Sequence, residues 1–149
     1  MRFRTLGEDK KKTKGKEQPD DLLSMFNVAD DRPEMRALAL YGDVNEEKCV
    51  EVIYGLLTLD FSGTAFLQTA DDTEPQLTLP EPIDFYISTY GGQAPEMFSV
   101  YDTMRMVRER TEIHTHGLGK VMSAGVLLLA AGTEGKRKIG KHCRVMIHG

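Results

Sequence analysis

The segment 124–131 consists entirely of small and aliphatic residues, and it constrains the fold more than any other part of the sequence. Its composition, with a glycine at Gly132, predicts a short helix that ends there. A helix that is apolar on all sides must be buried by other elements. Ser123 directly precedes this helix, so we expect it to lie where a core element reaches the surface.

The rest of the chain alternates between strand and helix patterns. The expected strands are 37–41, 83–88, 111–115, 136–139 and 143–148. Asp43, with Glu46 three residues later, predicts the cap of a first helix that ends at Ser62-Gly63, and its apolar face carries Cys49, Val52, Ile53, Leu56 and Leu57. The order strand, helix, strand, helix, strand, helix, strand, strand predicts an α/β fold.

Glycine and proline mark the connections between these elements. Gly91-Gly92 breaks the strand at 83–88, and Pro95 suits the first turn of the next helix. The buried face of that helix is expected to include Met97, Val100, Tyr101 and Met104, with the stem of Arg108 beside them. Gly117 and Gly119 are expected to turn the chain into the serine helix.

Two segments differ from the rest in composition. Residues 1–33 combine a lysine cluster with an acidic patch, which predicts a polar, flexible N-terminal extension. The remainder, 34–149, is expected to form one domain. Residues 62–82 contain prolines and acidic residues, which predict an exposed insertion in that domain.

Composition excludes several classes of function. The formal net charge is −4 at pH 7, which argues against nucleic acid as the main partner. No apolar run approaches membrane-spanning length, and the N-terminus lacks the apolar core of a secretory signal. The two cysteines, Cys49 and Cys143, show neither metal spacing nor a disulfide framework. These features predict a cytoplasmic protein without a membrane partner.

Ser123, His148 and the glycine pair together suggest acyl-transfer chemistry. A serine hydroxyl becomes a nucleophile when a base removes its proton and donors stabilise the oxyanion. His148 closes the apolar segment 144–148 and supplies a possible base, although a lone histidine there is more often structural. A serine before a helix is also often only an N-cap. Small residues after Ser123 would let a substrate backbone approach.

Three other patterns are weaker. The segment 135–141 has the spacing of a phosphate-binding loop, but His142 replaces the required Ser or Thr. His114 and His116 share a strand face without an evident third ligand, so no metal site is expected. Lys120 precedes Ser123 by three residues, but an exposed lysine makes a poor base.

The motifs also carry a family resemblance. The segments 85–92, 101–104, 122–125, 135–137 and 144–148 resemble, in order and spacing, the proteolytic subunit of the Clp protease (ClpP). A weaker match covers 36–59. The resemblance implies the crotonase-like ββα spiral, C-terminally incomplete here, with Ser123 as nucleophile and His148 as general base. It places the oxyanion hole at the backbone amides of Gly91 and Ala124.

The resemblance also carries expectations about partners and about departures from the family. It implies heptameric rings, stacked in pairs, that receive unfolded polypeptide from a hexameric Clp ATPase. ATP would be used by that unfoldase, and no cofactor or metal is expected in this chain. The family's acidic triad member lies well beyond its histidine, so no Asp or Glu up to Gly149 is assigned that role. Thr89-Tyr90 stands where the family usually has Ser-Pro.

Two alternatives remain open at this level. A crotonase-like acyl-CoA enzyme shares the fold and the two-amide oxyanion hole, but it would not need Ser123. A catalytically silent ring subunit would explain the absence of an assignable acid. Binding of coenzyme A would favour the first, and retention of Ser123 and His148 argues against the second.

Overall fold

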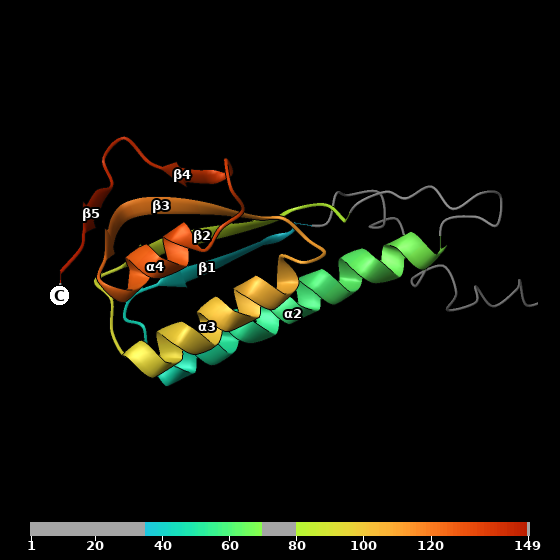
Figure 1. Ribbon diagram of the computed structural model, residues 1–149, viewed down its shortest axis with the longest axis horizontal. Helices are drawn as coiled ribbons and strands as arrows, with labels where there is room; N and C mark the ends of the chain where they lie inside the picture. The colour runs from blue at the N-terminus through green and yellow to red at the C-terminus, as the bar shows by residue number, and fades with distance from the viewer. Residues whose placement is uncertain (1–34, 70–79, 149) are drawn as a thin grey trace, which may run out of the picture. The chain divides into compact units, whose positions relative to one another are not determined.

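The computed structural model describes residues 35–69 and 80–148, with the main chain alone for 64–69. These residues belong to one compact unit, which begins at Met35. Its elements are β1 (Ala37–Tyr41), α2 (Glu46–Thr69), β2 (Ile83–Thr89), α3 (Ala94–Val107), β3 (Ile113–Met122), α4 (Ala124–Ala130), β4 (Arg137–Ile139) and β5 (Arg144–Met146), as Figure 1 shows. The predicted order of strands and helices is confirmed. The expected extension 1–33 and most of the expected insertion 62–82 lie outside the described residues.

The strands form a sheet in which all pairs are parallel, in the order β1-β2-β3-β4, with β5 also paired to β3. β4 pairs with the first half of β3, at Thr115 to Gly117, and β5 pairs with its last residues, Lys120 to Met122. Since β2 occupies the other edge of β3, β4 and β5 follow one another along the same edge (Figure 1). β5 therefore runs beside the residues that lead into Ser123.

β3 does not turn at its glycines, contrary to the sequence prediction. The strand continues through Gly117 and Gly119 as far as Met122. Its register with β2 shifts between two pairs, Ile87 with Gly117 and Thr89 with Val121, so residues 118–120 form a bulge opposite one residue of β2. Gly119 has φ +64° inside this bulge, a conformation that favours glycine.

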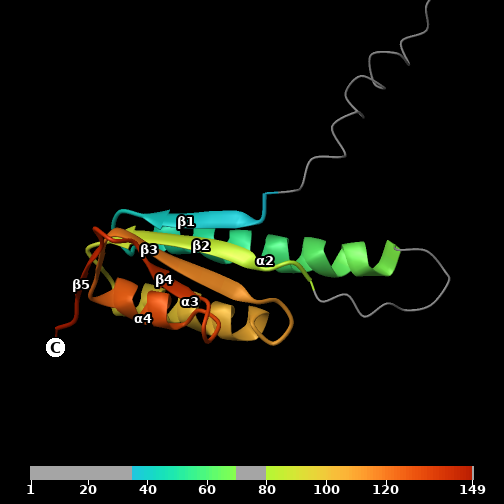
Figure 2. The same ribbon diagram turned by 90° about the horizontal axis from the view of Figure 1, so that it is seen from above.

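The three helices pack against one face of the sheet and enclose the core with it (Figures 1 and 2). Inward residues of the strands alternate with outward ones, so Ile83, Phe85 and Ile87 are fully buried while Tyr86 of the same strand is exposed. From α3, the buried residues include Met97, Val100 and Met104, as the sequence predicted.

α2 differs from its predicted form at both ends. The Oδ1 of Asn45, rather than a group of Asp43, accepts the amide of Lys48 at 3.0 Å, which is the geometry of an N-cap. The helix also continues past Gly63 to Thr69. Leu57, predicted to be buried, is 44% exposed.

Arg36 explains why the helix does not end at Ser62-Gly63. Its guanidinium donates to the carbonyl of Leu59 at 2.8 Å and to the hydroxyl of Ser62 at 3.2 Å. A Cβ atom on Gly63 would lie 2.9 Å from the Arg36 Nη2. The arginine therefore fills the space beside the glycine and stabilises a helix that glycine alone would weaken by about 1 kcal/mol.

A buried carboxylate links α2 to the start of β3. The side chain of Asp60 is 3% exposed, and it pairs with Arg110, which is 63% exposed. The hydroxyl of the buried Thr111 donates to Asp60 Oδ1 at 2.7 Å. Arg110 and Thr111 lie in the connection between α3 and β3. Their contact with Asp60 therefore holds α2 and the end of α3 at one end of the sheet.

Two buried threonines hold α4 against the sheet. A Cβ on Gly125, near the start of the helix, would lie 2.3 Å from the Cγ2 of Thr89 on β2. A Cβ on Gly132, just after the helix, would lie 2.4 Å from the Oγ1 of Thr115 on β3. Thr115 also donates to the carbonyl of Leu129 at 2.8 Å. Both threonines are fully buried, so α4 has close sheet contacts at each end.

In the part of the chain that the structure describes, no helix has the length and apolar character needed to cross a membrane.

Candidate active site

Ser123 lies between the end of β3 and the start of α4, and its backbone is strained. It has φ 51° and ψ −122°, and it is the only residue other than glycine with positive φ among the described residues. Its side chain does not cap the helix, and its hydroxyl makes no hydrogen bond to any described residue. The interpretation of Ser123 as a simple N-cap is therefore wrong. Strain of this kind concentrates at functional sites.

Gly91 lies directly against Ser123. A Cβ atom on this glycine would be 2.7 Å from the Cβ of Ser123 and 3.2 Å from the amide nitrogen of Ala124. Gly91 also has φ +104°, so both the space and the conformation require glycine. The fold thus brings together three of the four predicted site residues from two separate segments.

The amide of Gly91 is already engaged. It donates to the hydroxyl of Thr89 at 2.9 Å. By contrast, the amides of Gly92 and Ala124 make no hydrogen bond to the residues that the structure describes. The Gly91 amide therefore lies beside Ser123, as predicted, but the Thr89 hydroxyl already accepts its hydrogen. Its role as an oxyanion donor stays a prediction.

Val44 holds the glycine pair from the other side. Its amide donates to the carbonyl of Gly91 at 2.9 Å, and its carbonyl accepts the amide of Gln93 at 2.9 Å. A Cβ on Gly92 would lie 2.1 Å from the Val44 carbonyl oxygen. The turn is therefore fixed by the segment between β1 and α2 as well as by Thr89.

β5 carries His148 toward the same place. Met146 pairs with Met122, and its carbonyl accepts the amide of Ser123 at 2.9 Å. His148 follows two residues later with an exposed side chain. The main chain therefore brings the serine and the histidine into one region, although the Ser123 hydroxyl is not hydrogen-bonded to the imidazole in this structure. Catalytic hydrogen bonds often form only when substrate binds.

The side chain of Lys120 lies over two aromatic rings. Its ammonium lies 4.6 Å from the ring centre of Tyr90 and 5.6 Å from that of Tyr41. Aromatic faces attract a cation at such distances. The Lys120 side chain is therefore engaged with two aromatic rings.

Neither cysteine has the properties of a nucleophile. Cys49 is buried and Cys143 is half-buried. Burial raises the pKa of both thiols, and the carboxylate of Glu96 adds to this effect at Cys49. Since the thiolate is the reactive form, these residues are poorly suited to attack a carbonyl.

His114 and His116 are paired with carboxylates on the open face of the sheet. His116 Nε2 lies 2.6 Å from Asp84 Oδ1, and His114 Nε2 lies 3.0 Å from Glu112 Oε2. The hydrogen bond with His114, aided by nearby Lys136, lowers the pKa of the Glu112 carboxyl. The described residues contain no group of three or more potential ligands that could hold a metal ion.

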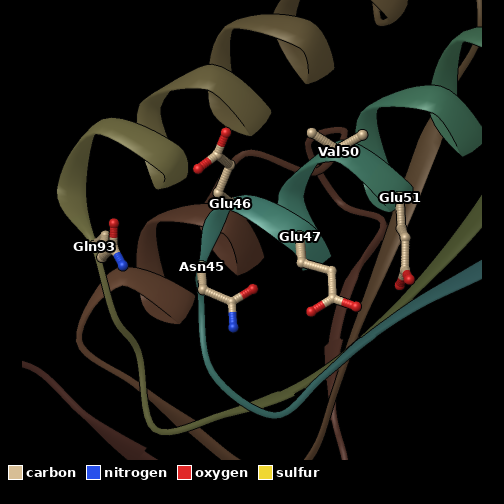
Figure 3. A pocket seen from close by; sticks show the side chains of 6 residues that line it. All are labelled: Asn45, Glu46, Glu47, Val50, Glu51 and Gln93. Atoms are coloured by element: carbon tan, nitrogen blue, oxygen red, sulfur yellow. The ribbon is translucent and has the colours of Figure 1, made fainter.

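A surface hollow lies away from Ser123. It has a volume of about 620 Å³ and lies where α2 and α3 begin, as Figure 3 shows. Its lining residues are Asn45, Glu46, Glu47, Val50, Glu51 and Gln93. None of the predicted site residues contributes to it.

Comparisons with known proteins identify the family of this chain. The family model described as Clp protease matches residues 23–149. A Clp protease proteolytic subunit 1 from Mycolicibacterium paratuberculosis is 41% identical over 86 residues, which cover 54% of this chain and 40% of that protein. A subunit 1 from Nocardia farcinica is 40% identical over 68 residues, which cover 46% of this chain and 34% of that protein. The chain thus spans about two-fifths or less of these relatives.

The fold comparison is consistent with the sequence comparison. The crystal structure of the ClpP protease catalytic domain from Plasmodium falciparum is similar with a TM-score of 0.61 and 27% identity. The match covers 92% of this chain and 65% of that chain. Together with the parallel sheet, it confirms the predicted ClpP/crotonase-like fold. On the family match over residues 23–149, this chain belongs to the Clp protease family.

Proposed function

We propose that this chain is a serine peptidase subunit that hydrolyses peptide bonds of unfolded polypeptides. The observation that carries the proposal is the strained Ser123, whose Cβ packs against Gly91, and Gly91 also lies next to the amide of Ala124. A serine used only for structure would have no reason to adopt this conformation. The family relationship makes peptide hydrolysis the natural reaction for such a serine.

In the proposed mechanism, the Ser123 hydroxyl attacks the peptide carbonyl while His148 accepts the serine proton. The carbonyl oxygen gains negative charge, and the amide of Ala124 stabilises it together with an amide of the glycine pair. The Gly91 amide would share its hydrogen with Thr89, or Gly92 would supply the second donor. His148 then gives its proton to the leaving amine. Water, deprotonated by the same imidazole, cleaves the acyl-enzyme.

The His148 step needs the imidazole to reach the Ser123 hydroxyl. The Ser123 amide is fixed to the Met146 carbonyl, so the main chains of the two elements stay together. Rotation of exposed side-chain bonds is fast, so a substrate can close the hydrogen bond between hydroxyl and imidazole. An extended substrate strand would order this region further by pairing with an exposed strand edge.

The proposal also concerns how this chain assembles with other subunits. Members of this family are named as subunits of an ATP-dependent protease. We propose that this chain associates with copies of itself in rings and receives unfolded polypeptide from a Clp ATPase. Exposed apolar residues in β4 and β5 and after β5 support an assembly, because isolated surfaces of this kind are unfavourable. They are Ile139, Val145, Met146 and Ile147.

Of the alternatives, the acyl-CoA enzyme is less well supported. Its oxyanion hole would use the same amides, but it gives no role to the Ser123 hydroxyl. The strained serine therefore favours the peptidase.

Covalent labelling tests the proposal. A fluorophosphonate should react with Ser123, and Ser123→Ala should abolish the reaction. Ser99→Ala is the matched control, because the Ser99 hydroxyl bonds only within α3, to the carbonyl of Pro95. His148→Ala should slow labelling by roughly 10³- to 10⁴-fold. Labelling that persists in Ser123→Ala, or its absence in the unmodified protein, would contradict the proposal.

A further inference from the structure

We propose that Thr89 is a positioning residue for the Ser123 site, and that its hydroxyl sets the orientation of the glycine turn. This inference rests on the proposed peptidase function. Thr89 ends β2, is fully buried and does not itself reach the reacting atoms. It differs from the proposed catalytic groups because it acts only through the two backbone segments that it touches.

The first of these segments is the glycine turn. The Thr89 hydroxyl accepts the amide of Gly91 at 2.9 Å, which closes a local turn from one side chain to the backbone two residues on. Gly91 has φ +104°, and free glycine has no strong preference for this conformation. The hydrogen bond therefore selects one orientation of the peptide plane beside Ser123.

The second segment is the first turn of α4. The Thr89 methyl, Cγ2, packs so closely on Gly125 that a Cβ there would lie 2.3 Å away. Gly125 follows Ser123 by two residues. The Thr89 side chain thus contacts both backbone segments of the site, the glycine turn at Gly91 and the first turn of α4 at Gly125.

The two functional groups of Thr89 have separate tasks. The hydroxyl orients the turn through Gly91, and the methyl spaces the sheet from α4 through Gly125. Serine at this position would keep the first contact and lose the second. Valine would keep the shape of the side chain and leave the buried Gly91 amide without an acceptor. The pair of substitutions therefore separates orientation from packing.

The experiment measures labelling of Ser123 by a fluorophosphonate in wild type, Thr89→Val and Thr89→Ser, with the dependence of the rate on reagent concentration. Misplacement of an oxyanion donor by about 1 Å costs roughly 10²-fold in rate. We therefore expect Thr89→Val to lower the maximal labelling rate by about tenfold to a hundredfold, with little change in the half-saturating reagent concentration. Thr89→Ser should restore the rate to within about threefold of wild type.

A matched control removes a buried hydroxyl elsewhere. Thr111 is as buried as Thr89, and its hydroxyl donates to Asp60 of α2. This hydrogen bond involves neither Ser123 nor the glycine turn. Thr111→Val should lower thermal stability and leave the labelling rate unchanged. A general loss of packing would instead slow labelling in all of the valine variants.

A second readout does not depend on activity. Hydrogen exchange at the Gly91 amide should be roughly fivefold faster in Thr89→Val, the factor that loss of one ordinary buried hydrogen bond gives. Exchange in the rest of β2 should not change. This measurement is independent of the reaction at Ser123.

The outcomes are distinguishable. Thr89→Val that labels at the wild-type rate, or Thr89→Ser that is as slow as Thr89→Val, overturns the positioning role. Unchanged exchange at Gly91 overturns the proposed orientation of the turn. If the wild-type protein does not label at all, the proposed function fails and the catalytic role of Thr89 fails with it, whereas the exchange result still decides whether Thr89 holds the turn.

Discussion

Gly91 packs so closely against Ser123 that a single added methyl group would overlap the serine side chain, with 2.7 Å between the two Cβ atoms. We predict that Gly91→Ala abolishes fluorophosphonate labelling of Ser123. Alanine also adds the cost of a positive φ, on the order of 1–2 kcal/mol. Gly42→Ala is the control, because Gly42 has φ +101° with no atom within 4 Å of the added Cβ.

Thermal unfolding and labelling of the two variants separate the cost of a positive φ from the steric overlap with Ser123. Gly42→Ala should lose stability and keep its labelling rate, whereas Gly91→Ala should lose both. Equal labelling rates in the two variants would show that the contact between Gly91 and Ser123 has no catalytic consequence.

Replacing Ser123 by glycine should stabilise the protein while it removes the nucleophile. Ser123 has φ 51° and ψ −122°, a conformation that costs a residue with a side chain roughly 1–3 kcal/mol. Ser123→Ala keeps this strain, and Ser123→Gly relieves it. We expect the glycine variant to have a free energy of unfolding about 1 kcal/mol above that of the alanine variant, measured in urea. The opposite order, which is normal elsewhere in proteins, would show that this backbone is unstrained.

Lys120→Met should leave labelling at Ser123 largely intact. The methionine keeps an apolar stem but loses the cation that lies over the rings of Tyr90 and Tyr41. Such contacts are worth about 0.5–1 kcal/mol at exposed sites, so the thermal midpoint should fall slightly. Complete loss of labelling would instead indicate a serine–lysine dyad. Lys120→Arg, which keeps the charge, should recover the stability.

The carboxylate of Asp60 should contribute more to stability than its exposed ion pair suggests. Asp60→Ala leaves the buried Thr111 hydroxyl without its acceptor, a loss of about 1–3 kcal/mol. Asp60→Asn keeps an acceptor and should lose clearly less. Urea unfolding measures both, and labelling of Ser123 should be unaffected. Equal destabilisation by the two variants would mean that the charge, rather than the hydrogen bond to Thr111, matters.

The order of elements was predictable because each has a strong local pattern. The alternation of Ile83, Phe85 and Ile87 identified β2, and the apolar segment after Ser123 identified α4. The family motifs then placed Gly91, Ser123 and Ala124 together, and the structure shows them in contact. Local pattern was sufficient to identify these elements, although it did not fix the ends of α2.

Element boundaries failed where a distant residue decided them. Ser62-Gly63 has the local signature of a helix end, but Arg36, which lies 26 residues earlier than Ser62, holds the helix together. Gly117 and Gly119 have the signature of a turn, but the strand continues through a bulge there, with β4 paired before the bulge and β5 paired at its end and beyond. Neither partner can be found by reading a local window of sequence.

Two features of the site could not be predicted from the sequence. The strain at Ser123 lies at the junction between β3 and α4, and serine alone does not signal it. Thr89 was noted only as a departure from the family's usual serine. Its burial interrupts the alternation of β2, since Ile87, Ser88 and Thr89 are all buried. A threonine two residues before a glycine was the one signal that pointed to the turn.

The two threonine contacts on α4 determine which part of the site is free to move. Thr89 meets Gly125 and Thr115 meets Gly132, so the short helix is fixed at two points along its axis. A rod fixed at two points can neither slide nor tilt, and the close fit at each glycine also opposes rotation. Ser123 is therefore the stationary half of the site. Because β5 is itself paired with β3, any adjustment that aligns the groups for reaction must come from rotation of the His148 side chain.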